Sequence, residues 1–306
     1  MADLAVIILT YNERLHIARA LRLVRPIARE IFVIDSFSSD DTVEIARNEG
    51  ATVLQNKFVN QSKQFQWALD NAPITAGWIM RLDADEEVHP DLAEEIEGTL
   101  PTLSDAIVGV NLKRRHIFLG RWIRHGGRYP LVLLRIWRRG KGKVEERWMD
   151  EHVTVQGGGT VTLRGGFADN NLNDLGFFID KHNKYATREA LDYLIRKHGL
   201  APTQVEASRL ASRQAVLKRL VKERFYYRVP FWLAAGSYFF YRYVLQLGFM
   251  DGQEGMIYHF LQGYWYRFLV GAKVVELERQ MQREAGNEMK LATLARLTGY
   301  PLEKLS

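Results

Sequence analysis

The sequence predicts an α/β fold with a mixed sheet flanked by helices, followed by a helical region at the C-terminal end. The first observation is a set of short, continuous apolar runs. Such runs are typical of strands buried on both faces of a sheet. The second is that helix-like segments alternate with these runs, which indicates successive β-α-β units. The third is a change to aromatic and basic composition after residue 217.

The elements of the first part follow from local patterns along the chain. The first apolar run ends at Thr10, the second ends at Asp35, and Gly50 is a typical stop for the helix before it. In order, we predict strands over residues 4–9, 30–35, 51–54 and 78–82, and helices over residues 14–23, 43–49 and 62–70.

Polar residues follow three of these strands where each one ends. The three segments are residues 10–13, 35–42 and 83–85. In open α/β sheets, ligands bind outside the carboxyl ends of the strands, near the point where the strand order reverses. We therefore expect the functional site at this edge of the sheet.

Asp83-Ala84-Asp85 is the most informative of the three segments. Residues two apart in a strand point to the same side, so Asp83 and Asp85 are expected to hold one divalent cation together. Mg²⁺ prefers one or two carboxylates plus substrate phosphates. The alternative is structural: acids at 85–87 precede a predicted helix start at residues 89–92 and would favour the positive end of its dipole.

The ordered set of segments at residues 10–13, 34–42 and 83–85 resembles the nucleotide-sugar domain of the family 2 glycosyltransferases, which have the GT-A fold. The resemblance covers roughly the first half of the chain. It implies that the first two segments bind a UDP-sugar and that the third binds Mg²⁺ or Mn²⁺, with Asp85 as the main metal ligand and Asp83 near the ribose and the metal. The implied nucleotide-sugar residues are Thr10, Tyr11, Asn12, Glu13, Asp35, Ser38, Lys63 and Asp83.

Several of these residues also have a structural interpretation. Asp40 or Asp41 would cap a helix, Lys63 would be a solvated cation, and Tyr11 would pack against its neighbours. The resemblance makes Tyr11 and Asp35 the pair that flanks the uracil.

The resemblance also implies a carboxylate that takes the proton from the acceptor hydroxyl. Asp150 and Glu151 lie where that base is expected, and we favour Glu151; the alternative is an ion pair with Arg138 or Arg147. Processive members of the family carry Gln-x-x-Arg-Trp after the base, whereas residues 144–148 lack the Gln and precede the acids. We therefore expect a nonprocessive enzyme, which transfers one sugar each time the acceptor binds.

Composition narrows the class of protein. The chain has 306 residues, 47% of them hydrophobic, and no cysteine, which excludes disulfides and thiol chemistry. Its net charge is +6, but no zinc-finger, RNP or basic-zipper pattern accompanies it, so we expect no nucleic-acid partner. The chain start lacks a basic segment, so its apolar run is expected to be a core strand and not a signal peptide.

The C-terminal third combines aromatic and basic residues, for example over residues 225–233 and 258–269, without the roughly 20 uninterrupted apolar residues of a membrane span. We expect amphipathic helices that lie on a membrane surface. The alternative is a helical subdomain packed on the core or forming a homo-oligomer. The predicted boundary divides residues 1–205 from residues 206–306.

Residues 181–190 and 248–255 resemble a bacterial subgroup that adds sugars to lipopolysaccharide core or to lipid-linked saccharides. That resemblance implies such an acceptor and a peripheral location at the cytoplasmic face of the inner membrane. Residues 114–128 are expected to shape the sugar pocket. The sequence leaves two alternative functions. One is a nucleotidyltransferase, which requires a glycine-rich phosphate loop that residues 10–13 lack, and the other is a catalytically silent membrane adaptor.

Overall fold

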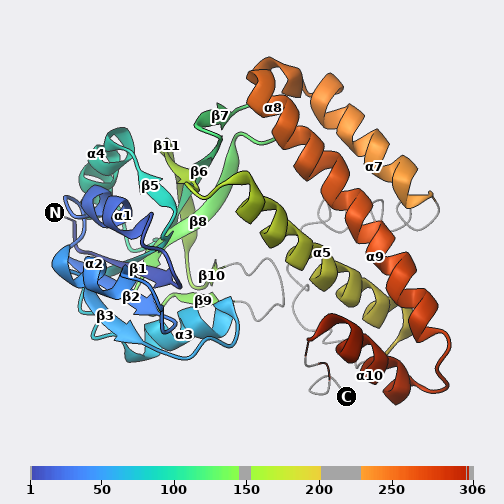
Figure 1. Ribbon diagram of the computed structural model, residues 1–306. Coiled ribbons are helices and arrows are strands. Elements are labelled where there is room, and N and C mark those ends of the chain that lie inside the picture. Colours follow the sequence, from blue (N-terminus) through green and yellow to red (C-terminus); the bar gives the residue numbers. More distant parts are fainter. Residues whose placement is uncertain (1, 145–152, 201–228, 301, 303–306) are drawn as a thin grey trace. The chain divides into compact units, whose positions relative to one another are not determined.

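The computed structural model describes residues 2–144, 153–200, 229–300 and 302 (Figure 1). The chain divides into two compact units, Met1–Leu172 and Asn173–Ser306. The predicted boundary between residues 205 and 206 lies outside the described residues. The observed division is earlier in the chain because the helix after residue 174 packs within the second unit.

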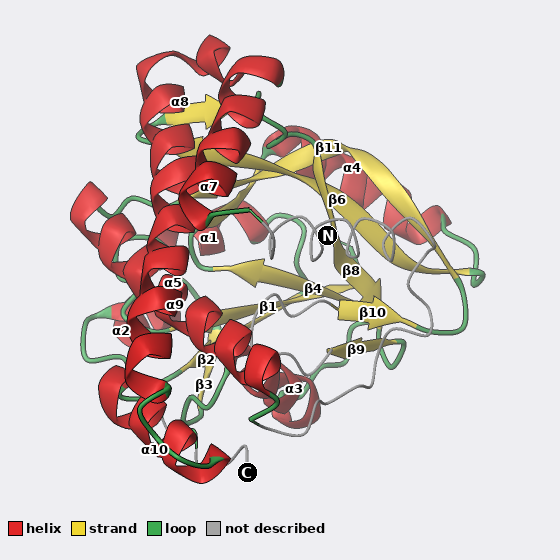
Figure 2. Cartoon of the chain, turned by 90° about the vertical axis from the view of Figure 1, so that its right-hand side faces the viewer, coloured by secondary structure: helices red, strands yellow, loops and turns green. Residues whose placement is uncertain are grey.

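The first unit is built on one mixed sheet with the strand order β3-β2-β1-β4-β8-β6-β11-β5, and β7 pairs with β6. The strands β1 to β4 are parallel to one another, while β8 is antiparallel to both β4 and β6. The strands are the yellow arrows of Figure 2. Their bounds are β1 Leu4–Thr10, β2 Glu30–Asp35, β3 Thr52–Gln55, β4 Trp78–Asp83, β5 Glu86–Val88, β6 Ile107–Phe118, β7 Arg121–Ile123, β8 Leu131–Arg138 and β11 Gly159–Asn170.

Helices cover both faces of this sheet. Their bounds are α1 Ile17–Val24, α2 Thr42–Asn48, α3 Gln61–Asn71 and α4 Pro90–Thr99, followed by the short 3₁₀ helix η1 Leu100–Thr102. A separate two-stranded sheet pairs β9 Gly142–Val144 with β10 Val153–Val155. The predicted α/β fold with a mixed sheet is confirmed, and so is the order of its first seven elements.

The core explains why the first apolar run becomes a doubly buried strand. Alternate residues of β1 point to opposite faces. Leu4, Val6 and Ile8 join the core cluster that includes α1, α2 and α4. Ala5 and Ile7 join the cluster that includes α3. With apolar partners on both faces, every position of the strand favours an apolar side chain.

The second unit is helical in the residues described. It contains α5 Leu175–His198, α7 Phe231–Phe240, α8 Gly252–Tyr258, α9 Tyr266–Met281 and α10 Asn287–Thr298, with π-helical turns η2 Tyr241–Leu245 and η4 His259–Trp265 and a 3₁₀ turn η3 Gly248–Asp251. Leu191, Leu194, Leu277 and Leu294 share one core that joins α5, α9 and α10. Among the described helices, none is both long and apolar enough to cross a membrane. The predicted C-terminal helical region is confirmed.

Candidate functional site

The ends of β1 and β2 are joined by the carboxylate of Asp35, which is fully buried. It accepts hydrogen bonds from Thr10 Oγ1 (3.1 Å), the backbone N–H of Ser38 (2.9 Å) and Gln55 Nε2 (3.1 Å), and one more from the Ser38 hydroxyl. A buried carboxylate is tolerated only when its oxygens are paired in this way. Asp35 therefore fixes the loops that leave both strands.

Asn12 ties the same two loops together. Its N–H donates to Ser38 Oγ at 2.8 Å, and its Oδ1 accepts from the N–H of Ser39 at 2.9 Å. Both Asn12 (φ 55°) and Phe37 (φ 60°) have left-handed backbone conformations. That conformation is costly for a residue with a side chain and persists where the surroundings impose it. The two loops are therefore held in one specific arrangement.

Two exposed aromatic rings project from these fixed loops. Tyr11 follows β1 and is 61% exposed, and Phe37 follows β2 and is 58% exposed. Thr10 and Asp35 are directly paired between the two strands, so the rings leave adjacent strand ends. Exposed aromatic faces on a rigid support are suited to stacking against a nucleobase. Phe37 was not among the predicted site residues, although an aromatic within a Ser- and Asp-rich turn is a usable signal.

Glu13 is held by a buried histidine that the sequence analysis missed. His16 Nδ1 lies 2.6 Å from Glu13 Oε2, and His16 Nε2 accepts the N–H of Leu172 at 2.9 Å. Since Nε2 is an acceptor, the ring proton is on Nδ1 and is donated to Glu13. The backbone N–H of Glu13 also donates to Thr42 Oγ1 at 2.8 Å. This turn is the reason why α1 begins at Ile17 and not at residue 14.

Asp83 ends β4 next to the β1 end, where Leu9 is its direct partner. Its carboxylate lies 3.5 Å from Arg81 Nε and 3.6 Å from Arg135 Nη2. Burial by itself would raise the pKa of Asp83, but the two guanidinium groups outweigh burial and hold the pKa below its ordinary value. Asp83 is therefore an anion next to two cations.

Arg135 is a buried site residue that local sequence patterns did not single out. Besides Asp83, it contacts Glu86, to which Arg135 Nη2 donates at 2.5 Å. Glu86 in turn accepts the backbone N–H of Asp83 at 2.9 Å. The end of β4 is thus braced by a strand that lies beside it in the sheet but 52 residues later in the chain.

Asp85 is positioned differently from the prediction. It lies in the turn between β4 and β5, so strand alternation does not place it beside Asp83, and that reason was wrong. Its Oδ2 accepts from Asn171 Nδ2 at 2.9 Å, and its backbone carbonyl accepts the N–H of Asn170 at 3.0 Å. The end of β11 therefore sets the position of this carboxylate.

The alternative, in which the acids at residues 85–87 favour the positive end of the dipole of the following helix, is not supported by their positions. Glu86 and Glu87 form β5, and α4 begins only at Pro90, with Asp91 as the acid of its first turn. Glu87 instead pairs with Arg19 at 2.8 Å and accepts from Asn170 Nδ2 at 2.7 Å.

The carboxylates at the end of β4 suit a cation that takes some of its ligands from a substrate. Among the described residues, no group of three or more His, Cys, Asp or Glu side chains is arranged to hold a metal ion. Asp83 and Asp85 would supply two oxygen ligands. Mg²⁺ in nucleotide sites commonly uses one or two carboxylates together with phosphate oxygens, so this donor set fits such an ion.

Lys63 is exposed on the first turn of α3. The helix is capped by Asn60, whose Oδ1 accepts the N–H of Lys63 at 2.8 Å. The next residue, Gln64, donates to Ser36 Oγ at 3.2 Å, which anchors the start of α3 to the loop after β2. The structure therefore brings the segment that carries Lys63 to the predicted edge.

The predicted bases Asp150 and Glu151 lie outside the described residues. The described strands on either side, β9 and β10, pair with each other, with Val153 opposite Val144.

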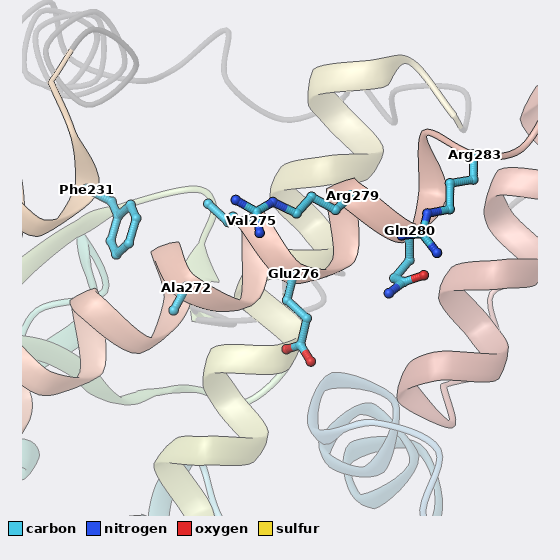
Figure 3. Close-up of a pocket in the computed structure, with 7 residues that line it drawn as sticks. All are labelled: Phe231, Ala272, Val275, Glu276, Arg279, Gln280 and Arg283. Carbon is cyan, nitrogen blue, oxygen red and sulfur yellow. The ribbon is translucent and has the colours of Figure 1, made fainter.

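A pocket of about 470 Å³ lies in the second unit, on one side of α9 (Figure 3). Phe231 contributes from the start of α7 and the other labelled residues come from α9 or just after it. The lining residues are Phe231, Ala272, Val275, Glu276, Arg279, Gln280 and Arg283. All of these residues belong to the second unit, whereas the predicted site residues in the described part of the chain belong to the first unit.

Comparison with known proteins gives a family for the first unit. The model of a family described as "Glycosyl transferase family 2" matches residues 5–169, more than half of the chain. Two uncharacterized glycosyltransferases, from Rickettsia typhi and Rickettsia felis, are 37% and 39% identical to this chain. Each match extends over 97 residues, which is 32% of this chain. The matched segment spans 32% and 34% of those relatives, about a third of their length.

Solved structures give a weaker likeness. The glucosyl-3-phosphoglycerate synthase from Mycobacterium tuberculosis, in complex with Mn²⁺, UDP and glucosyl-3-phosphoglycerate, has 22% sequence identity and a TM-score of 0.31. The match covers 37% of this chain and 43% of that one. A likeness this slight transfers no ligand to this chain.

Proposed function

Since the chain belongs to glycosyl transferase family 2, we propose that it is a metal-dependent, inverting, nonprocessive glycosyltransferase that uses a UDP-sugar. The mixed sheet flanked by helices is the GT-A fold expected of that family. The observation that supports the proposal most is the joining of three neighbouring strand ends into one polar edge. Thr10 is opposite Asp35, and Leu9 is opposite Asp83, so β1, β2 and β4 end together.

In the proposed donor complex, the uracil lies against Tyr11 and Phe37, on loops fixed by Asp35. Asn12 and Ser38 keep these loops in register, and Glu13 and Lys63 lie on segments that border them. Because the loops are tied to each other before any ligand binds, little ordering entropy is lost on binding.

Asp83 and Asp85 are the proposed ligands of Mg²⁺ or Mn²⁺. When bound, such a cation neutralises the negative charge that develops on the departing diphosphate, so that no protein acid is needed there. The protein's own contribution is placement: Arg81 and Arg135 keep Asp83 ionised, and Asn171 orients Asp85.

The proposed general base is Glu151, with Asp150 as the alternative. The base takes the proton from the acceptor hydroxyl as its oxygen attacks the anomeric carbon from the face opposite UDP. Attack from that face inverts the configuration and gives a β-linkage from an α-configured donor.

We further propose a lipid-linked or lipopolysaccharide-core saccharide as acceptor, and a peripheral location at the cytoplasmic face of a bacterial inner membrane. Support comes from the second unit, where large apolar side chains are exposed along residues 232–268. Those most exposed are Trp232, Phe240, Tyr241, Leu245, Phe249 and Met250, each between 48% and 63% exposed. Exposed apolar and aromatic side chains in this number are typical of a surface that contacts lipid or protein.

The test is UDP release from a panel of UDP-sugars, with and without Mn²⁺ and with detergent-solubilised bacterial lipid as acceptor. We expect turnover of one UDP-sugar, and we expect this turnover to require the metal and the acceptor. Asp85→Ala and Glu151→Ala should each lower kcat by at least about 100-fold. Asp70→Ala removes an exposed carboxylate from α3 and should leave the rate unchanged.

Full metal-dependent turnover by Asp85→Ala would contradict the metal assignment. Binding of UDP without turnover of any donor would favour the silent adaptor instead. A rise in melting temperature with UDP and Mn²⁺ measures whether UDP binds at all, because a ligand that binds only the native state stabilises it.

A further inference from the structure

The segment from β6 to β9 is strongly basic. Residues 106–144 contain eleven Lys and Arg residues and no Asp or Glu. Six of these cations fall within residues 113–130, together with His116 and His125. This shorter segment, here called the basic hairpin, contains the second half of β6, all of β7 and the loop to β8.

The basic hairpin is held together by strand pairing and by contacts to aromatic rings. β6 and β7 pair from His116 with Ile123 to Phe118 with Arg121. The ring of Trp122 is contacted by two guanidinium groups, that of Arg124 at 4.7 Å and that of Arg115 at 5.3 Å. Its edge meets Tyr129 at 5.0 Å between ring centres. These contacts hold cations in place on an aromatic support.

The base of the hairpin adjoins the proposed donor site. Asp169 pairs with Arg114 at 3.5 Å and with His116 at 3.2 Å, and it is opposite Glu86 in the sheet. Glu86 directly follows Asp85. The hairpin therefore begins at the same charged edge as the carboxylates at the end of β4.

The hairpin extends well beyond that edge. Met80 is opposite Ile136, Leu131 is opposite Arg114, and His116 is opposite Ile123. Ile136 is also opposite Val110 of β6, so Asp83 and Lys113 each lie three residues past the same level. His116, opposite Ile123, lies three residue steps further, or about 10 Å at about 3.4 Å per step. Figure 1 shows β7 standing at the ends of β6 and β8. A phosphate bound here is thus distinct from a diphosphate held at Asp83.

We propose that the basic hairpin binds a phosphate group carried by the acceptor, so that the acceptor is a phosphorylated saccharide. The exposed Arg121 and Arg124 are the groups expected to meet it. Arginine suits this role because its planar group donates paired hydrogen bonds to phosphate oxygens. This inference rests on the proposed transferase function and adds the chemical class of its second substrate.

The test measures binding of glucose 6-phosphate and of glucose to the full chain saturated with UDP and Mn²⁺, by titration calorimetry. The double variant Arg121→Gln/Arg124→Gln is compared with Arg139→Gln/Lys141→Gln, which removes two exposed cations from the opposite end of β8. We expect glucose 6-phosphate to bind and glucose not to bind, and we expect salt to weaken the binding of the phosphate ester. The hairpin variant should lower the affinity for the phosphate ester at least about tenfold, because a hydrogen bond to a charged group is worth about a tenfold change in affinity. The control variant should change affinity less than about twofold.

Three outcomes would overturn the inference. They are equal binding of the neutral sugar, equal loss in the control variant, and competition between the phosphate ester and UDP. A parallel sedimentation assay with phosphatidylglycerol vesicles tests lipid head groups as the other source of phosphate. If the chain binds vesicles through Arg121 and Arg124 but does not bind the sugar phosphate, the hairpin is a lipid-binding surface and the inference is wrong.

Failure of this inference can be told apart from failure of the proposed function. If UDP and Mn²⁺ raise the melting temperature but no sugar phosphate binds, only the acceptor class is wrong. If UDP with Mn²⁺ does not bind, the donor assignment fails and the acceptor inference falls with it.

Discussion

The carboxylate of Asp35 accepts hydrogen bonds from Thr10, Ser38 and Gln55 in the protein interior. At the scale of single residues, the role of Asp35 is therefore to fix the loops that follow β1 and β2. A contact between Asp35 and a nucleobase would be a second role. The distinction has a measurable consequence, because a residue that organises loops affects both stability and binding when it is changed.

We expect Asp35→Asn to lower the free energy of unfolding by about 1–3 kcal/mol, because the new amide donor faces groups that are themselves donors. The looser loops should also weaken UDP binding in the presence of Mn²⁺ by about tenfold. Urea unfolding and titration calorimetry measure the two effects. Asp41→Asn is the matched control, since Asp41 is exposed in the same loop and makes no side-chain cap to α2. Unchanged stability in Asp35→Asn would refute the organising role.

At the scale of elements, α5 and α9 are linked by a charged cluster as well as by their apolar core. Glu278 on α9 lies 2.8 Å from Lys197 Nζ and 2.6 Å from His198 Nε2. Partial burial would raise the pKa of Glu278, but the hydrogen bonds from Lys197 and His198 outweigh burial and lower that pKa. The pKa of Lys197 is raised in turn by its hydrogen bond to Glu278.

A lowered carboxyl pKa predicts the sign of a pH dependence. The stability that Glu278 contributes is present above its unfolded pKa of about 4.3 and is lost as the pH falls through the lower folded value. Glu278→Gln should therefore reduce stability at pH 6 by at most about 1 kcal/mol, since Lys197 is largely exposed, and the difference from wild type should vanish towards pH 3. Urea midpoints across pH 3–7 measure this, with Glu276→Gln, an exposed neighbour on α9, as control. A difference that grows on acidification would contradict the assignment.

The elements that could be predicted are those with local patterns. A strand such as β1 is buried on both faces, so its whole run is apolar and visible in the sequence. The contacts that complete the site are not local: His16 meets the backbone of Leu172, 156 residues away, and Arg135 meets Glu86 across 49 residues. The contact of His16 depends on where the chain leaves β11, and the contact of Arg135 depends on β8 lying beside β4. No periodicity in the sequence encodes either arrangement. Asp85 shows the same limit, since its turn is set by the end of β11.

At the scale of the whole molecule, the exposed apolar residues of the second unit predict membrane binding. Leu245 is 63% and Phe249 is 48% exposed, on the turns that connect α7 to α8. Burying two such side chains in lipid is worth about 1.5–3 kcal/mol each.

We therefore expect Leu245→Asp/Phe249→Asp to reduce partitioning onto vesicles of anionic lipid by more than about tenfold. Co-sedimentation of the full chain measures it. Leu297→Asp, at an exposed position of α10, is the control and should bind like wild type. If wild type and both variants partition equally, another surface carries the contact, and if wild type does not partition, the proposed location is wrong.

The last residues of the first unit hold both halves of the proposed donor site. Leu172 donates its N–H to His16, which holds Glu13, and Asn171 donates to Asp85. The chain then passes directly into the second unit at Asn173. A shift of the chain at this junction would reach the loop that carries Glu13 and the turn that carries Asp85 through these hydrogen bonds. The two residues before Asn173 thus link the start of the second unit to both parts of the proposed donor site.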